Sequence, residues 1–221
     1  MKERPILFSA PMVRALLAGT KTQTRRALKV QPTGTPHAGQ ASLTKSMSKP
    51  VFYAMWEEPA ADGSTCCLCP YGVPGDRLWV REGHSIGPGP DVQLVPGEGA
   101  GSLRWPHVTY AADGAVERRD ERWKGEFGKR RPSIHMPRWA SRITLEVTGV
   151  RVERLHDISE RDAIAEGAPG YEEGIDAPPP DDEHEWSYLA SFIRLWESIN
   201  GPGSWDANPY VWVVEFKRIS A

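Results

Sequence analysis

Cysteine is scarce in this chain of 221 residues, and its three cysteines, Cys66, Cys67 and Cys69, lie close together. An odd, clustered set of thiols argues against the disulfide framework that small secreted proteins use. The cluster could bind zinc with His84 as a fourth ligand, but structural zinc sites usually take a second ligand pair from a distant segment. The sequence offers no such pair, so we expect no bound metal.

Long hydrophobic runs are also missing. No stretch approaches the roughly 20 apolar residues of a membrane-spanning helix, and residues 1–5 lack the apolar core of a signal peptide. The formal net charge of −2 favours no particular class of partner. We therefore expect a cytoplasmic protein that does not associate with membranes.

The most informative segment present is Gly19–Arg26, which holds three cations and three threonines. It follows an apolar stretch, Ile6–Leu17, in which Met12, Val13, Leu16 and Leu17 have the spacing of one helix face. Gly19 is typical of a helix C-cap, because glycine adopts the left-handed conformation at little cost. The polar run is thus predicted at a turn, either as a solvated basic loop or as an anion or nucleotide site.

Four segments in order resemble one protein family, the ASCH domain proteins. Leu17–Arg26 resembles the ASCH signature, but Thr24 stands at a position where the general pattern has Glu. The version with Thr resembles the bacterial ASCH amidohydrolases that cleave N(4)-acetylcytidine. Residues 75–82, 158–167 and 210–217 resemble the G-D-x-L-x-V strand, the helix ending in A-x-x-E-G and the closing strand of that family. The chain as a whole resembles a longer branch met in phages and prophages, which implies action in the cytoplasm of a bacterial host.

The resemblance implies an α+β fold, a PUA-like small and mostly antiparallel β-barrel with flanking helices. We expect a single domain over residues 1–221, because a mixed domain with loops fits the composition better than two domains do. Hydrophobic patterning predicts strands at 77–82, 143–152 and 211–219 and helices at 159–166 and 186–199. Long loop insertions are predicted at 32–50, 87–101 and 167–185, which are rich in Gly, Pro, Ser or acidic residues.

Three residues are implied as catalytic by the resemblance: Thr24 as nucleophile, Lys21 as its base and Glu166 as a proton-handling or orienting group. A threonine hydroxyl needs a neighbour that accepts its proton, and a lysine serves as that base only when its pKa falls from about 10.4 toward 7–8. On one extended strand Lys21 and Thr24 would face opposite sides. The mechanism therefore requires a turn between them, and it needs no cofactor.

A second group of residues is predicted to bind substrate or nucleic acid. The segment Arg131–Arg142 mixes cations, hydroxyls, a histidine and a tryptophan, which can grip phosphates and stack on bases. It can equally be a surface loop anchored by its tryptophan. The full predicted binding set is Arg25, Arg26, Arg81, Ser133, His135, Arg138 and Trp139.

The sequence leads to one principal expectation and two alternatives. The principal expectation is a metal-independent amidohydrolase that acts on an acylated nucleoside or nucleobase. The alternatives are an RNA-binding PUA-like module without catalysis and an ASCH-type ribonuclease. In each case the partner is a modified nucleoside, nucleotide or RNA, and the acyl group, the oligomeric state, any protein partners and the biological pathway are left open.

Overall fold

The computed structural model describes residues 1–41, 51–88, 106–113, 129–169 and 187–219. The elements along the chain are β1 (Glu3–Leu7), α1 (Ala10–Ala18), β2 (Gln23–Ala27), β3 (His37–Ala41), β4 (Val51–Met55), β5 (Cys66–Leu68), β6 (Arg77–Arg81), β7 (His84–Pro88), β8 (Pro106–Tyr110), η1 (Ala111–Asp113), η2 (Ser133–His135), η3 (Arg138–Ala140), β9 (Thr144–Arg154), η4 (Leu155–Asp157), α2 (Glu160–Ala165), α3 (Tyr188–Asn200) and β10 (Tyr210–Ile219).

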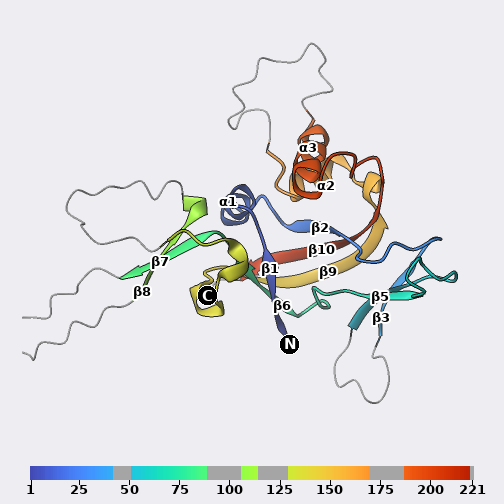
Figure 1. Cartoon of the computed structure of the whole chain (residues 1–221), viewed down its shortest axis with the longest axis horizontal. Coiled ribbons are helices and arrows are strands. Elements are labelled where there is room, and N and C mark those ends of the chain that lie inside the picture. Colours follow the sequence, from blue (N-terminus) through green and yellow to red (C-terminus); the bar gives the residue numbers. More distant parts are fainter. Residues whose placement is uncertain (42–50, 89–105, 114–128, 170–186, 220–221) are drawn as a thin grey trace, which may run out of the picture.

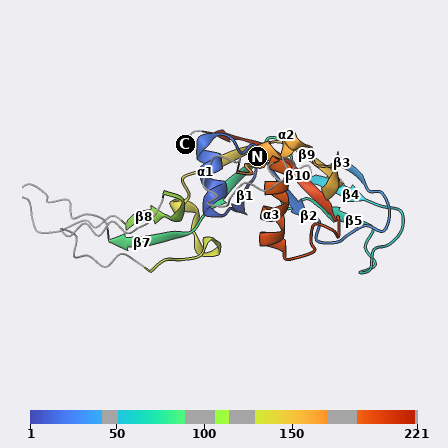
Figure 2. The same cartoon turned by 90° about the horizontal axis from the view of Figure 1, so that it is seen from above.

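The principal sheet has five strands in the order β1-β6-β9-β10-β2 (Figure 1). Only β1 and β6 pair in parallel among these strands, and the other neighbours are antiparallel. Strands β3-β4-β5 form a second sheet and β7-β8 a third, and both views place these two small sheets at opposite ends of the molecule (Figures 1 and 2). Within the described ranges the sheets are open, so the fold is α+β and mostly antiparallel.

Strand β10 separates two hydrophobic cores. Val211 and Val213 pack into a core with α2 and α3, whereas Trp212 and Val214 pack into a larger core with α1, β6 and β4. Burial on both faces explains why β10 is an almost continuous apolar run instead of an alternating one. Helices α2 and α3 lie side by side near β2, the strand that carries the candidate catalytic threonine (Figure 1).

Most of the predicted elements are confirmed within a residue or two, as β6, β9, β10, α2 and α3. The first helix is shorter than predicted. Ile6 belongs to β1, and α1 begins only after Ser9, whose extended backbone forms the N-cap. Leu17 is exposed, so its expected place in the buried helix face was wrong.

The predicted insertions lie largely outside the described residues. At their margins, β3 forms within 32–50 and β7 ends within 87–101. Residues 42–50, 89–101 and 170–185 of these segments are not described. In the part of the chain that the structure describes, no helix is both long and apolar enough to cross a membrane.

Candidate active site

The turn after α1 places Lys21 ahead of the strand that carries Thr24. Gly19 has φ 81° and ends the helix, as its sequence position predicted. The backbone N–H groups of Thr20 and Lys21 then donate to the carbonyl of Ala15 at 3.0 and 3.2 Å. Strand β2 starts only at Gln23, so Lys21 and Thr24 do not lie on one strand. The alternation of side chains along a strand therefore does not place them on opposite sides.

Glu166 reaches the same place from α2. Ser159 and Asp162 form a capping box at the start of this helix, and Glu166 is its C-cap residue. Gly167 follows with φ 74°, and a Cβ atom there would lie 2.8 Å from the Cβ of Ala15 and 3.0 Å from that of Lys21. The Glu-Gly pair therefore lets the end of α2 approach α1 and Lys21 closely.

Lys21 and Glu166 form a buried ion pair. Lys21 Nζ donates to Glu166 Oε2 at 3.1 Å and to the Glu166 backbone carbonyl at 2.6 Å, and only 2% of the Lys21 side chain is exposed. Burial lowers the pKa of Lys21 below its ordinary value, and Arg26 and Arg25 add to that effect, while Glu166 opposes it. The net direction is the one that a general base requires.

Arg25 anchors the other side of Glu166. Its side chain is fully buried and contacts three carboxylates, those of Glu166 at 3.2 Å, Asp162 at 3.4 Å and Glu153. Burial raises the pKa of Asp162, but hydrogen bonds from Ser159 and Gln23 and the charge of Arg25 outweigh it, so the pKa is about 2. Arg25 thus fixes acidic side chains beside the site. Its buried Nε has no hydrogen-bond partner among the described residues and remains as a donor for a ligand.

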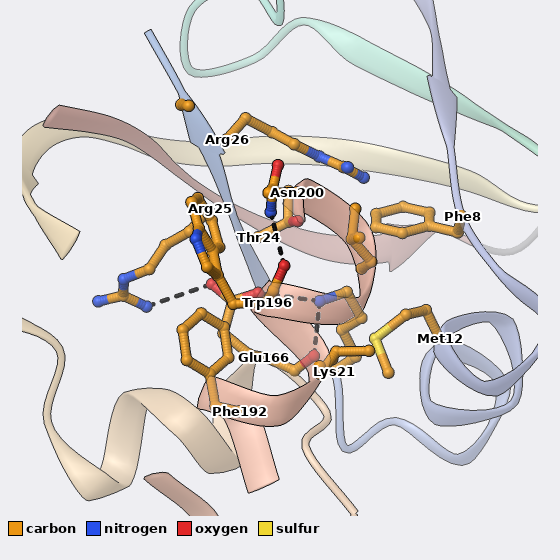
Figure 3. A pocket seen from close by; sticks show the side chains of 13 residues that line it. Phe8, Met12, Lys21, Thr24, Arg25, Arg26, Glu166, Phe192, Trp196 and Asn200 are labelled. Carbon is orange, nitrogen blue, oxygen red and sulfur yellow. Dashed lines mark hydrogen bonds and ion pairs between the residues drawn. The ribbon is translucent and has the colours of Figure 1, made fainter. Parts of the chain in front are cut away.

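The cavity that joins these residues has a volume of about 70 Å³. Figure 3 shows Lys21, Thr24 and Glu166 around it. The full lining comes from β1–α1, β2, the end of α2 and α3 and consists of Phe8, Met12, Lys21, Thr24, Arg25, Arg26, Ala27, Glu166, Phe192, Leu195, Trp196, Ile199 and Asn200. The cavity therefore combines an apolar wall with a charged base.

Thr24 lies in β2 opposite Val214 of β10 and is buried. Its hydroxyl makes no side-chain hydrogen bond with any residue in the described ranges, whereas Lys21 and Glu166 are bonded to each other. The three predicted catalytic residues thus share one cavity. The polar groups of Lys21 and Glu166 are paired with each other, whereas the hydroxyl of Thr24 is available to a ligand.

The α3 side of the cavity was missed by sequence reasoning. Apolar positions of α3 predicted a buried helix face, but Leu195 and Ile199 line the cavity. Asn200, the last residue of the helix, also lines it. Helix α3 has more apolar residues than one buried face needs, and this excess was the sequence signal for a second apolar surface on the helix.

Arg26 is the remaining predicted binding residue at this cavity. Its guanidinium lies over the ring of Phe8 at 5.5 Å, and its Nη2 donates to the carbonyl of Leu7 at 2.7 Å. This position at the mouth agrees with a binding role, which stays a prediction.

The other predicted binding residues lie outside the cavity lining. Arg81 donates to the carbonyls of Met136, at 3.2 Å, and Ile134, and so holds the 131–142 segment against β6. Ser133 and His135 lie in η2, and Arg138 and Trp139 lie in η3. Arg138 forms an exposed ion pair with Glu3, and Trp139 is 59% exposed. These residues form a surface separate from the cavity.

The cysteines lie in and beside β5, far along the chain from the cavity-lining residues. Cys66 is exposed, and burial raises the pKa of Cys69 to about 11. Among the described residues, no group of three or more His, Cys, Asp or Glu side chains is arranged to hold a metal ion.

Comparison with protein-family models, with curated proteins and with solved structures gave no significant match.

Proposed function

We propose that this protein is a metal-independent amidohydrolase of the ASCH type that cleaves the amide bond of an acylated nucleoside or nucleobase. The observation that carries the proposal is the convergence of Lys21, Thr24 and Glu166 on one cavity. The four ordered motifs and the α+β fold support it. We further propose that the five-stranded sheet corresponds to a PUA-like barrel.

In the proposed reaction, Thr24 Oγ attacks the acyl carbon while Lys21 accepts its proton. The C–N bond then breaks, and the leaving nitrogen takes that proton from Lys21, which leaves an ester on Thr24. Water attacks the ester carbon and gives a proton to Lys21, which returns it to Thr24 Oγ as the carboxylic acid departs. Glu166, bonded to Lys21 and Arg25, keeps the amine in place during both steps.

The test is release of free acid from N(4)-acetylcytidine. Thr24→Ala should abolish release but keep ligand affinity within about tenfold, because the substitution removes the nucleophile and little contact area. Thr22→Ala is the matched control, since Thr22 lies outside the cavity lining and should be dispensable. Full turnover by Thr24→Ala would refute the assigned nucleophile.

A second candidate is a single-stranded RNA-binding module, favoured by the exposed indole of Trp139. A tryptophan that is 59% exposed beside Arg138 is suited to stack on a base. In that case wild-type protein should bind RNA with an affinity that falls steeply with salt, and Trp139→Ala should weaken binding while Thr24→Ala should not. Turnover of an acylated nucleoside would favour the hydrolase instead.

A further inference from the structure

Asn200 presents a fixed hydrogen-bond acceptor at the mouth of the cavity. It is exposed, ends α3 and lines the cavity together with Thr24 and Arg26 (Figure 3). Its Nδ2 donates to the carbonyl of Trp196 at 3.0 Å. Because a carbonyl only accepts, the NH₂ end of the carboxamide must face Trp196. One N–H of Nδ2 is used there, so Oδ1 and the second N–H remain for a ligand, and Oδ1 is the acceptor.

Arg26 supplies donors to the same mouth. Its one side-chain hydrogen bond among the described residues uses Nη2, and its planar group is held over Phe8. A guanidinium has five N–H donors, so several remain for a ligand. A planar ligand edge that carries an N–H donor beside a carbonyl-type acceptor would complement Asn200 and Arg26.

We propose that Asn200 is a specificity-determining residue whose Oδ1 accepts the N–H of a secondary amide on the substrate. This inference rests on the proposed hydrolase function and narrows its substrate class to N-acylated amino heterocycles that keep an amide hydrogen. Esters and N-alkylated amides lack that hydrogen and are rejected.

The position of Asn200 also suits the chemistry. In a secondary amide the nitrogen that carries the hydrogen is bonded directly to the acyl carbon that Thr24 would attack. An acceptor in the same cavity as Thr24 therefore orients the scissile bond as well as recognising it.

The experiment pairs a change in the ligand with a change in the protein. N(4)-acetylcytidine is compared with its N(4)-methyl derivative, which lacks the amide hydrogen. Wild-type protein should prefer the first by about tenfold or more in kcat/KM, the effect of losing about one hydrogen bond. Asn200→Leu keeps most of the side-chain volume and removes the acceptor, so it should lose that preference.

Ser198→Ala is the matched control. Ser198 is also exposed near the end of α3, and its Oγ donates to the carbonyl of Leu195 at 2.7 Å, but it does not line the cavity. This variant should keep the wild-type preference. The recognition role is overturned if Asn200→Leu lowers kcat/KM by the same factor for both ligands. It is also overturned if this variant keeps the wild-type preference for N(4)-acetylcytidine.

The outcomes separate this inference from the proposed function. If acetylcytidine is cleaved and Asn200→Leu still discriminates, the hydrolase stands and the role of Asn200 falls. If neither ligand is cleaved, the hydrolase falls, and calorimetric titration of the two ligands decides the recognition role. The recognition role is supported if wild-type protein binds N(4)-acetylcytidine more tightly than the N(4)-methyl derivative and Asn200→Leu abolishes that difference. It is overturned if the two ligands bind equally well or if neither binds.

Discussion

Lys21 donates to two oxygens of Glu166, the backbone carbonyl at 2.6 Å and the carboxylate at 3.1 Å. A carboxylate at the C-terminus of a helix is mildly unfavourable on its own. Here the cation of Lys21 offsets both the side-chain charge and the helix-end carbonyl. The ion pair therefore also explains why Glu166 is tolerated at the end of α2.

The pH dependence of activity should report Lys21. Burial lowers the pKa of Lys21, and only the neutral amine accepts a proton, so kcat/KM should rise with pH along a limb whose midpoint lies below 10.5. Glu166→Gln removes a charge that raises this pKa and should move the limb to lower pH. A pH–rate profile measures both, and a midpoint at or above 10.5 would contradict the buried base.

Arg25 should be the most important cation for stability. Arg25→Gln leaves the carboxylates of Glu166, Asp162 and Glu153 without their shared partner and should cost about 3–5 kcal/mol in the free energy of unfolding. Arg26→Gln, at a half-buried position, should cost about 1 kcal/mol or less. Urea unfolding of the two variants tests the contrast, and equal losses would contradict it.

Gly167 should be required for the approach of α2 to Lys21. Gly167→Ala and Gly63→Ala both place alanine at a positive φ, +74° and +79°, but only at Gly167 would the new Cβ meet other atoms within 4 Å. Gly167→Ala should therefore be the more destabilising by about 1–3 kcal/mol and should also lower turnover. Thermal unfolding and acid release measure the two effects, and similar Tm values would argue against the close approach.

Asp162 should stabilise the fold above pH 4 and not below pH 2. Its pKa in the folded protein is about 2, below the ordinary 3.8. Its contribution to the free energy of unfolding is therefore fully present above the pKa of the unfolded chain and is lost as the pH falls through the pKa of the folded protein. Asp162→Asn should cost about 1–2 kcal/mol at neutral pH and progressively less on acidification. Ser159→Ala, which removes a hydrogen bond to this carboxylate, should raise its pKa, as NMR titration would show.

The cavity should admit small acyl groups only. Its volume is about 70 Å³, and an engineered apolar cavity of about 150 Å³ is of the size that holds benzene. Acetylcytidine should therefore be cleaved at least about tenfold faster than benzoylcytidine. Leu195→Ala enlarges the cavity and should reduce that preference, whereas Leu189→Ala, outside the lining, should leave it unchanged.

The segments with the strongest apolar patterns were predictable from sequence, and the short polar ones were not. Strand β10 is a nearly continuous apolar run and helix α3 has apolar residues at helical spacing, so the positions of both follow from their hydrophobic pattern. Strand β2 escaped prediction because its sequence, Gln23 to Ala27, is mostly polar. Its burial depends on charge pairing with α2 and β9, which no local pattern reveals.

The same contrast applies to the site. Lys21, Thr24 and Glu166 were chosen from motifs, and Gly19 correctly predicted the turn that separates Lys21 from β2. The pairing of Arg25 with carboxylates and the place of Asn200 at the mouth depend on contacts between distant segments. Such contacts become visible only when the tertiary structure is known.

The position of β10 in the sheet bears on how the chain is made. β10 pairs with both β9 and β2, so the strand partner of Thr24 is Val214, which a ribosome synthesises long after Thr24 itself. Until then β2 is an unpaired edge, and such long-range pairing is intrinsically slow. A nascent chain released before residue 210 would expose two strand edges and two open cores, which makes premature termination a direct route to aggregation.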